Sequence, residues 1–116
     1  MRKPLVWEGS SKKDFKEFPI PTQKDMGVAL FVVQLGGMPD SSKPWKGLGS
    51  GIYELVGDYR GDTFRAVYTV RVGETIHVLH AFQKKSKSGI STPLPDVNLI
   101  EKRLKSVLAR HGLSGR

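Results

Sequence analysis

The stretch that decides the fold is residues 63–83, which reads TFRAVYTVRVGETIHVLHAFQ. Over residues 63–72 the side chains alternate in a two-residue period, which is typical of a β-strand. Gly73 and Glu74 predict a two-residue hairpin turn, because a type II′ turn has glycine at its first central position. Residues 75–83 then return as the next strand. We therefore expect an antiparallel strand pair at the centre of the domain.

The chain before this hairpin predicts one strand, two helices and another strand. Residues 5–7 form a short apolar run that suits an opening strand, and a short helix follows Ser10. Apolar residues recur at helical spacing over residues 23–35, and Thr22 is a candidate cap for this second helix. Gly36 and the following residues up to 51 are rich in glycine and proline, which predicts a loop. Residues 52–56 then form the strand before the hairpin.

The chain after the hairpin predicts a polar loop and a final helix. Pro95 suits the first turn of that helix. Its buried stripe consists of Val97, Ile100, Leu104 and Val107. The element order is β-α-α-β-β-β-α, which defines an α+β domain with an antiparallel sheet, an N-terminal helical hairpin and a C-terminal helix.

Length and composition favour a single soluble domain spanning residues 1–116. A chain of 116 residues has the size of one domain, and neither half holds enough apolar residues for a core of its own. The absence of cysteine excludes disulfides, thiolate metal sites and a cysteine nucleophile. No apolar run approaches the roughly 20 residues that a membrane helix needs. We expect a cytoplasmic protein without a membrane segment.

Charge gives the first indication of function. The net charge is +8, and residues 41–116 hold 13 basic and 6 acidic side chains, compared with 6 and 5 in residues 1–40. Such an asymmetric positive field attracts polyanions such as RNA. Basic proteins without a nucleic-acid partner are also common, so solubility remains an alternative explanation.

The predicted hairpin places a group of polar side chains on one face of the sheet. Counting back from the turn puts Arg65 opposite Phe82 and Val67 opposite His80. Lys84 then shares this face, unless a one-residue bulge puts Lys85 in its place. A cation, an imidazole, an aromatic ring and a lysine on one open surface are typical of RNA binding, which uses stacking and phosphate contacts.

Each of these residues also has an ordinary structural interpretation. Phe82 is more often a core residue than a stacking platform, His80 more often a structural histidine, and residues 84–87 a solvated charged loop. His77 and His80 face opposite sides of their strand, so they do not predict a metal site.

Residues 47–87 resemble the phage-derived HigB-like toxins of the RelE/ParE superfamily. The resemblance is carried by GIYEL at 51–55, FRAVY at 64–68 and VLHAFQKKS at 78–86. Its signature is Arg-x-x-Tyr on one strand and Phe-x-Lys-Lys at the end of the next. It implies a RelE-like fold for the whole chain.

The resemblance also implies the toxin of a type II toxin–antitoxin system. Such toxins typically enter the ribosomal A site and cut mRNA during translation, and a cognate antitoxin neutralises them. In the HigB arrangement the antitoxin is a HigA-like helix-turn-helix protein, and the complex binds operator DNA to repress its own operon.

Cleavage of RNA through its own 2′-hydroxyl needs a base, an acid and cations, with no metal or organic cofactor. Arg65 aligns with the superfamily's phosphate-contacting arginine, and Lys84 or Lys85 with the cationic position on the following strand. His80 is a candidate acid or base, because an imidazole ordinarily titrates near neutrality. Glu54 is a candidate base, or a strand residue paired with Arg65.

Four further residues are expected to bind RNA: Arg60, Phe82, Lys87 and Lys46. The chain departs from RelE at two places. RelE carries two lysines on the strand before the arginine, where Glu54 and Val56 stand here, and a tyrosine after its last strand, where Ser91 stands here. Two alternatives therefore stay open. One is a non-enzymatic ParE-like toxin that acts on gyrase, and the other is an inactive RNA-binding relic.

Overall fold

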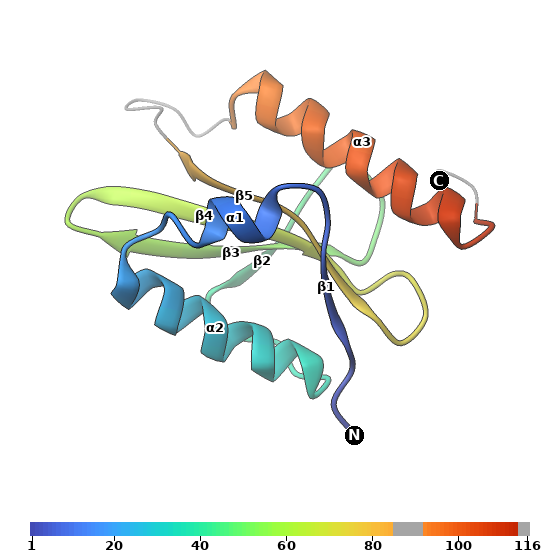
Figure 1. Cartoon of the computed structure of the whole chain (residues 1–116), viewed down its shortest axis with the longest axis horizontal. Coiled ribbons are helices and arrows are strands. Elements are labelled where there is room, and N and C mark those ends of the chain that lie inside the picture. Colours follow the sequence, from blue (N-terminus) through green and yellow to red (C-terminus); the bar gives the residue numbers. More distant parts are fainter. Residues whose placement is uncertain (85–91, 114–116) are drawn as a thin grey trace.

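The computed structural model describes residues 1–84 and 92–113 of the chain (Figure 1). The elements follow the order β1 (Leu5–Trp7), α1 (Ser11–Phe15), α2 (Ile20–Gln34), β2 (Ser42–Pro44), β3 (Ile52–Tyr59), β4 (Asp62–Thr69), β5 (Ile76–Lys84) and α3 (Leu94–Arg110). None of the described helices is long and apolar enough to cross a membrane.

The five strands form one sheet in the order β1-β5-β4-β3-β2. Strands β2 to β5 pair antiparallel with their neighbours, whereas β1 lies parallel to the first residues of β5. Helix α2 lies on one face of the sheet and α3 covers the other, whereas α1 lies beside β5 and adds Phe15 to the core under α2 (Figure 1). The domain therefore has three layers.

Two hydrophobic cores separate these layers. The first lies between α1, α2 and the sheet, and it contains Leu30, Leu55 and Tyr68 among its buried members. The second lies under α3 and contains Val67 and Leu104. Because side chains alternate along a strand, β4 sends Ala66 and Tyr68 into the first core and Val67 into the second. The central strands are thus buried on both faces.

The expected α+β fold with a helical hairpin and a C-terminal helix is confirmed, with two additions. Residues 42–44, expected to be loop, form β2, in which Ser42 pairs with Leu55 of β3. Strand β1 joins the sheet in parallel, so the sheet is mixed where we expected it to be antiparallel. Both strands lie at the edges of the sheet and are three residues long, and the partner of β1 is about 70 residues away in sequence. Helix α2 also begins earlier than expected, at Ile20 after Pro19, so Thr22 lies inside it.

The predicted two-residue turn at Gly73 and Glu74 is wrong. Strand β4 ends at Thr69 and β5 begins at Ile76, and the register shifts by one residue beyond Val67. This shift is a β-bulge in β5, and Leu79 is its extra residue. On the side of the bulge away from the turn, the register is the expected one. Here Arg65 lies opposite Phe82, Val67 opposite His80 and Lys84 opposite Thr63. The face assigned to these residues is therefore correct although the turn is not.

Truncation of the α3 stripe tests the second core. Leu104 is 2% exposed, and Leu104→Ala should lower the free energy of unfolding by about 2–5 kcal/mol, because the lost methyl groups leave a cavity. Lys105→Ala, on the exposed side of the same helix, should change it by less than about 0.5 kcal/mol. Urea denaturation measures both. Equal effects of the two substitutions would mean that α3 does not pack on the sheet through this stripe.

Candidate functional site

An ion pair between β3 and β4 is the centre of the candidate site. Nη1 of Arg65 donates to Oε1 of Glu54 at 2.6 Å. The two residues are diagonal neighbours on the face covered by α3, a position from which long side chains can meet. Their side chains are only 15% and 13% exposed, so the pair is held with little surrounding water. A charge-assisted hydrogen bond of this kind is strong and directional.

The guanidinium of Arg65 has donors beyond those that Glu54 uses. A guanidinium carries five N–H groups. Its Nε is buried and has no hydrogen-bond partner among residues 1–84 and 92–113. A buried donor without an acceptor costs free energy, so an arginine of this kind is suited to an additional acceptor such as an anion.

His80 and Phe82 lie inside the protein. They are 5% and 8% exposed, and their rings stack at 4.9 Å between centroids with 17° between their planes. His80 Nε2 is 2.7 Å from Oδ1 of Asp96 at the start of α3. The expected open surface is therefore wrong for these two residues. The apolar stripe of α3 packs against this face of the sheet and so covers it.

The other predicted cations that the structure describes lie in separate parts of the molecule. Lys84, at the end of β5, lies on the same face of the sheet as Arg65. It is partly buried and already has an interaction partner. Arg60 is exposed at the β3–β4 turn, with its guanidinium 5.1 Å from the ring centre of Tyr59. Lys46 is exposed in the loop after β2. Lys85 and Lys87 lie outside the described residues.

A groove of about 690 Å³ adjoins the ion pair. Glu54 belongs to its lining, together with Trp45, Lys46 and Leu48 from the loop after β2 and Val97 and Glu101 from α3. The sequence interpretation included Lys46 and Glu54 but missed Trp45 and Glu101. The signal for Trp45 was a large aromatic residue beside a lysine in a glycine-rich loop, but only the fold brings α3 opposite to it.

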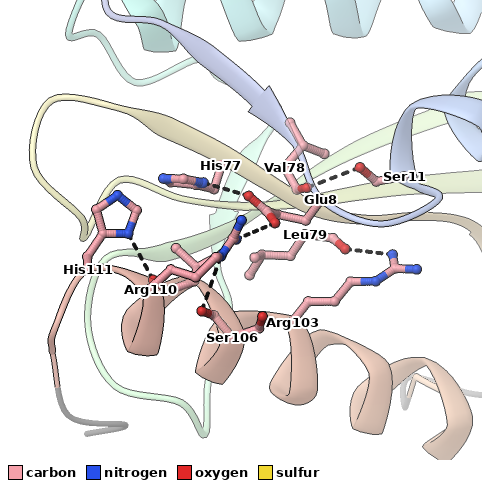
Figure 2. A network of polar contacts seen from close by, with 10 residues as sticks. Glu8, Ser11, His77, Val78, Leu79, Arg103, Ser106, Arg110 and His111 are labelled. Atoms are coloured by element: carbon pink, nitrogen blue, oxygen red, sulfur yellow. Dashed lines mark hydrogen bonds and ion pairs between the residues drawn. The ribbon is translucent and has the colours of Figure 1, made fainter.

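A second polar cluster fastens the far end of α3 to the sheet (Figure 2). Glu8, just after β1, lies between two basic side chains. Its Oε2 is 2.8 Å from Nδ1 of His77 on β5, and its Oε1 accepts a hydrogen bond from Nη2 of Arg110 at 2.5 Å. Nearer the middle of the helix, Nη1 of Arg103 donates to the backbone oxygen of Leu79 at 2.8 Å. This cluster was missed because its members are about 70 and 100 residues apart.

The Glu8 carboxylate is stabilised in its charged form. Burial acts to raise its pKa, but the hydrogen bonds from His77 and Arg110, with their positive charge, outweigh burial and lower the pKa below 4.5. The charged carboxylate therefore contributes to the stability of the folded protein, since the unfolded chain cannot offer these partners.

Residues 13–105 match the family described as phage derived protein Gp49-like. The chain belongs to this family, which confirms the resemblance noted in residues 47–87. No curated protein matches the sequence.

The solved structures that are similar to the chain include one from a toxin–antitoxin complex. It is a chain of the crystal structure of the toxin–antitoxin complex RelBE2 from Mycobacterium tuberculosis. The TM-score is 0.46 and the sequence identity 17%, and the match covers 74% of this chain and 95% of that chain.

The Glu8 cluster predicts a pH dependence of stability. Because folding lowers the pKa of Glu8, its contribution should be present above about pH 4.3, the usual pKa of a free glutamate, and should be lost as the pH falls through the lower folded pKa. Glu8→Gln should therefore lower the free energy of unfolding by about 1–3 kcal/mol at pH 7 and by much less at pH 3. Urea denaturation at both pH values measures the difference. Asp25→Asn, an exposed carboxylate, is the control, and a deficit of Glu8→Gln that persists at pH 3 would contradict the prediction.

Proposed function

We propose that the chain is the toxin of a toxin–antitoxin system and cleaves mRNA on the translating ribosome. The observation that carries this proposal is the Arg65–Glu54 pair, a guanidinium and a carboxylate in contact at the edge of a groove. Membership of the Gp49-like family supports the toxin assignment. The positive charge concentrated in residues 41–116 supports an RNA substrate.

The pair supplies a base and a cation, two of the groups that cleavage through the 2′-hydroxyl needs. The 2′-oxygen bonds to the adjacent phosphorus, the bond from phosphorus to the 5′-oxygen breaks, and the products carry a 2′,3′-cyclic phosphate and a 5′-hydroxyl. Glu54 takes the proton of the 2′-hydroxyl, and Arg65 stabilises the charge that builds up on the phosphate. Lys84, on the same face, is our candidate for protonating the leaving 5′-oxygen.

The ion pair also suits the change of charge during the reaction. Before reaction the Glu54 carboxylate neutralises Arg65. Once Glu54 holds the proton it is neutral, and the guanidinium is free to bind the phosphate oxygens in its place. His80 has no step in this scheme, because its Nε2 is bonded to Asp96 and the ring is buried.

Further RNA contacts and partners complete the proposal. Arg60 and Lys46 are exposed and suit contacts with the RNA backbone. By the resemblance to HigB-like toxins, the partner that neutralises the protein is a HigA-like helix-turn-helix antitoxin, through which the complex binds operator DNA. Action on ribosomes would place the protein in the cytoplasm.

Substitution of the ion pair tests the proposed chemistry. Glu54→Gln keeps the shape of the side chain but removes the base, and it should lower cleavage on the order of a hundredfold or more, as should Arg65→Ala. The measurement is mapping of RNA ends after induction of each variant without the antitoxin. Asp62→Asn, an exposed carboxylate on β4, should cleave like the wild type.

Folding and alternative targets are checked in the same experiment. Arg65→Ala leaves the carboxylate of Glu54 largely buried without a partner, so circular dichroism must show that the variant is folded. Full cleavage by a folded Glu54→Gln protein would disprove the role of this residue. DNA breaks with intact messages would indicate action on gyrase, and normal growth would indicate an inactive relic.

Binding to RNA should depend steeply on salt. If about five cations each neutralise a phosphate, the slope of log K against log salt should lie between about −3 and −4.5. Lys46→Ala should reduce this slope by about 1, because one phosphate contact is lost. Fluorescence anisotropy of a labelled single-stranded RNA measures both. A slope near zero would show that RNA is not the direct partner.

A further inference from the structure

The groove beside the ion pair has the size and the lining of a ligand site. Its volume of about 690 Å³ lies in the range of small-molecule pockets, roughly 300–1,000 Å³. Glu54 belongs both to the groove and to the ion pair, so a group seated in the groove lies next to Arg65. If the phosphate of a nucleotide sits at Arg65, its neighbouring base can reach the groove.

One side of the groove is apolar and aromatic. Trp45 and Leu48 are partly buried and pack against the core under α3, which limits the movement of the indole ring. An indole held at the edge of a groove is a platform on which a base can stack. Stacking is tolerant of sequence, so Trp45 supplies affinity for a base without selecting one. Lys46, exposed beside it, suits a flanking phosphate.

Two of the polar side chains that line the groove are carboxylates, and they share the lining with Lys46 and Thr92. Glu54 and Glu101 are carboxylates, and an ionised carboxylate accepts hydrogen bonds but donates none. Glu54 is occupied by Arg65, whereas the partner of Glu101 among residues 1–84 and 92–113 is Lys105, at 3.2 Å in a solvent-exposed pair along the helix. Such surface pairs are weak and easily exchanged. The carboxylate of Glu101 is therefore the group that can read a base.

A carboxylate distinguishes the four RNA bases by their Watson–Crick edges. Guanine presents two adjacent donors, the N1–H and the amino group at C2, which a carboxylate can accept side by side. Adenine and cytosine place an acceptor nitrogen next to their amino group, and uracil has a single donor between two carbonyl oxygens. Those acceptors would face the oxygens of Glu101 with repulsion. Glu101 would repel a phosphate in the same way, so we assign the flanking phosphate to Lys46.

We propose that this groove binds a guanine base of the RNA substrate, stacked on Trp45 and recognised through N1–H and the amino group by the carboxylate of Glu101. The inference rests on the proposed function, because it places the guanine next to the phosphate that Arg65 holds. It adds a specificity-determining residue, Glu101, on a helix that carries none of the proposed chemistry. Cleavage should then favour messages with guanine beside the cut bond.

Tryptophan fluorescence gives a direct test that needs no cleavage. The chain has two tryptophans, and Trp7 lies in the other core, against Phe15 at 5.1 Å. In a Trp7→Phe background the emission therefore reports on Trp45 alone. The probes are 2′-O-methyl pentanucleotides of uridine with G, A, C or U at the centre, which cannot be cleaved because the attacking hydroxyl is blocked. The G probe should quench Trp45 and bind at least tenfold more tightly than the other three.

Two variants separate base recognition from structure. Glu101→Gln replaces an acceptor oxygen by an amide donor and should reduce the preference for the G probe to less than threefold. Lys105→Met removes the ion-pair partner but leaves the carboxylate, so it should keep the preference. Trp45→Ala, measured by anisotropy of a labelled G probe, should weaken binding at least tenfold.

The outcomes decide the inference separately from the proposed function. Equal affinity for the four probes, no binding of any probe, or a preference that Glu101→Gln leaves unchanged would each overturn the guanine site. Cleavage of messages, compared between the wild type and Glu54→Gln, decides the nuclease proposal on its own. A guanine preference without cleavage would support the guanine site and contradict the nuclease proposal. Cleavage without any guanine preference would support the nuclease proposal and contradict the guanine site.

Discussion

The antiparallel pairing of β4 with β5 is the interaction on which the rest of the structure depends. Both strands are buried on both faces, with Tyr68 directed to the helical hairpin and Val67 to α3. A polar side chain on either strand must therefore find a partner inside the protein. Arg65 is paired with Glu54 and His80 with Asp96 for this reason. The chemistry available at the site follows from these pairings.

Helix α3 links the stability of the domain to the shape of the candidate site. Its apolar stripe closes the second core, and its last turn is held by Arg110 at Glu8. Its first half provides Val97 and Glu101 to the groove and Asp96 to His80. A change that loosens this helix should therefore alter the groove as well as the core. For this reason variants of the groove need a folded control on the same helix.

The position of the Arg65–Glu54 pair also determines how RNA could approach. Both side chains are largely buried. Glu54 lines the groove, so RNA could reach the pair through it. The positive surface of the molecule can attract an RNA strand, but the groove itself holds two carboxylates. Long-range attraction and local recognition thus come from different residues. Such a division is common in nucleic-acid binding, where backbone contacts position and base contacts specify.

The sequence by itself determined the features that depend on local periodicity. The alternation in residues 63–72 predicted β4, and the spacing of Ile100 and Leu104 predicted α3. The strand register at Arg65 and Phe82 was also predicted correctly, although the turn was not, because the bulge at Leu79 offsets the longer connection. Glu54, expected either as a base or as a partner of Arg65, does contact Arg65, and its role as a base stays a proposal.

Only the tertiary structure decided that both faces of the sheet are covered. The strand pattern shows that two faces exist, but the docking of α3 removes His80 and Phe82 from solvent. Trp45 and Glu101 meet across a groove although they are far apart in sequence, and Glu8 meets Arg110 in the same way. Contacts of this kind leave no periodic signal, because they depend on how whole elements pack and not on the neighbours of each residue along the chain.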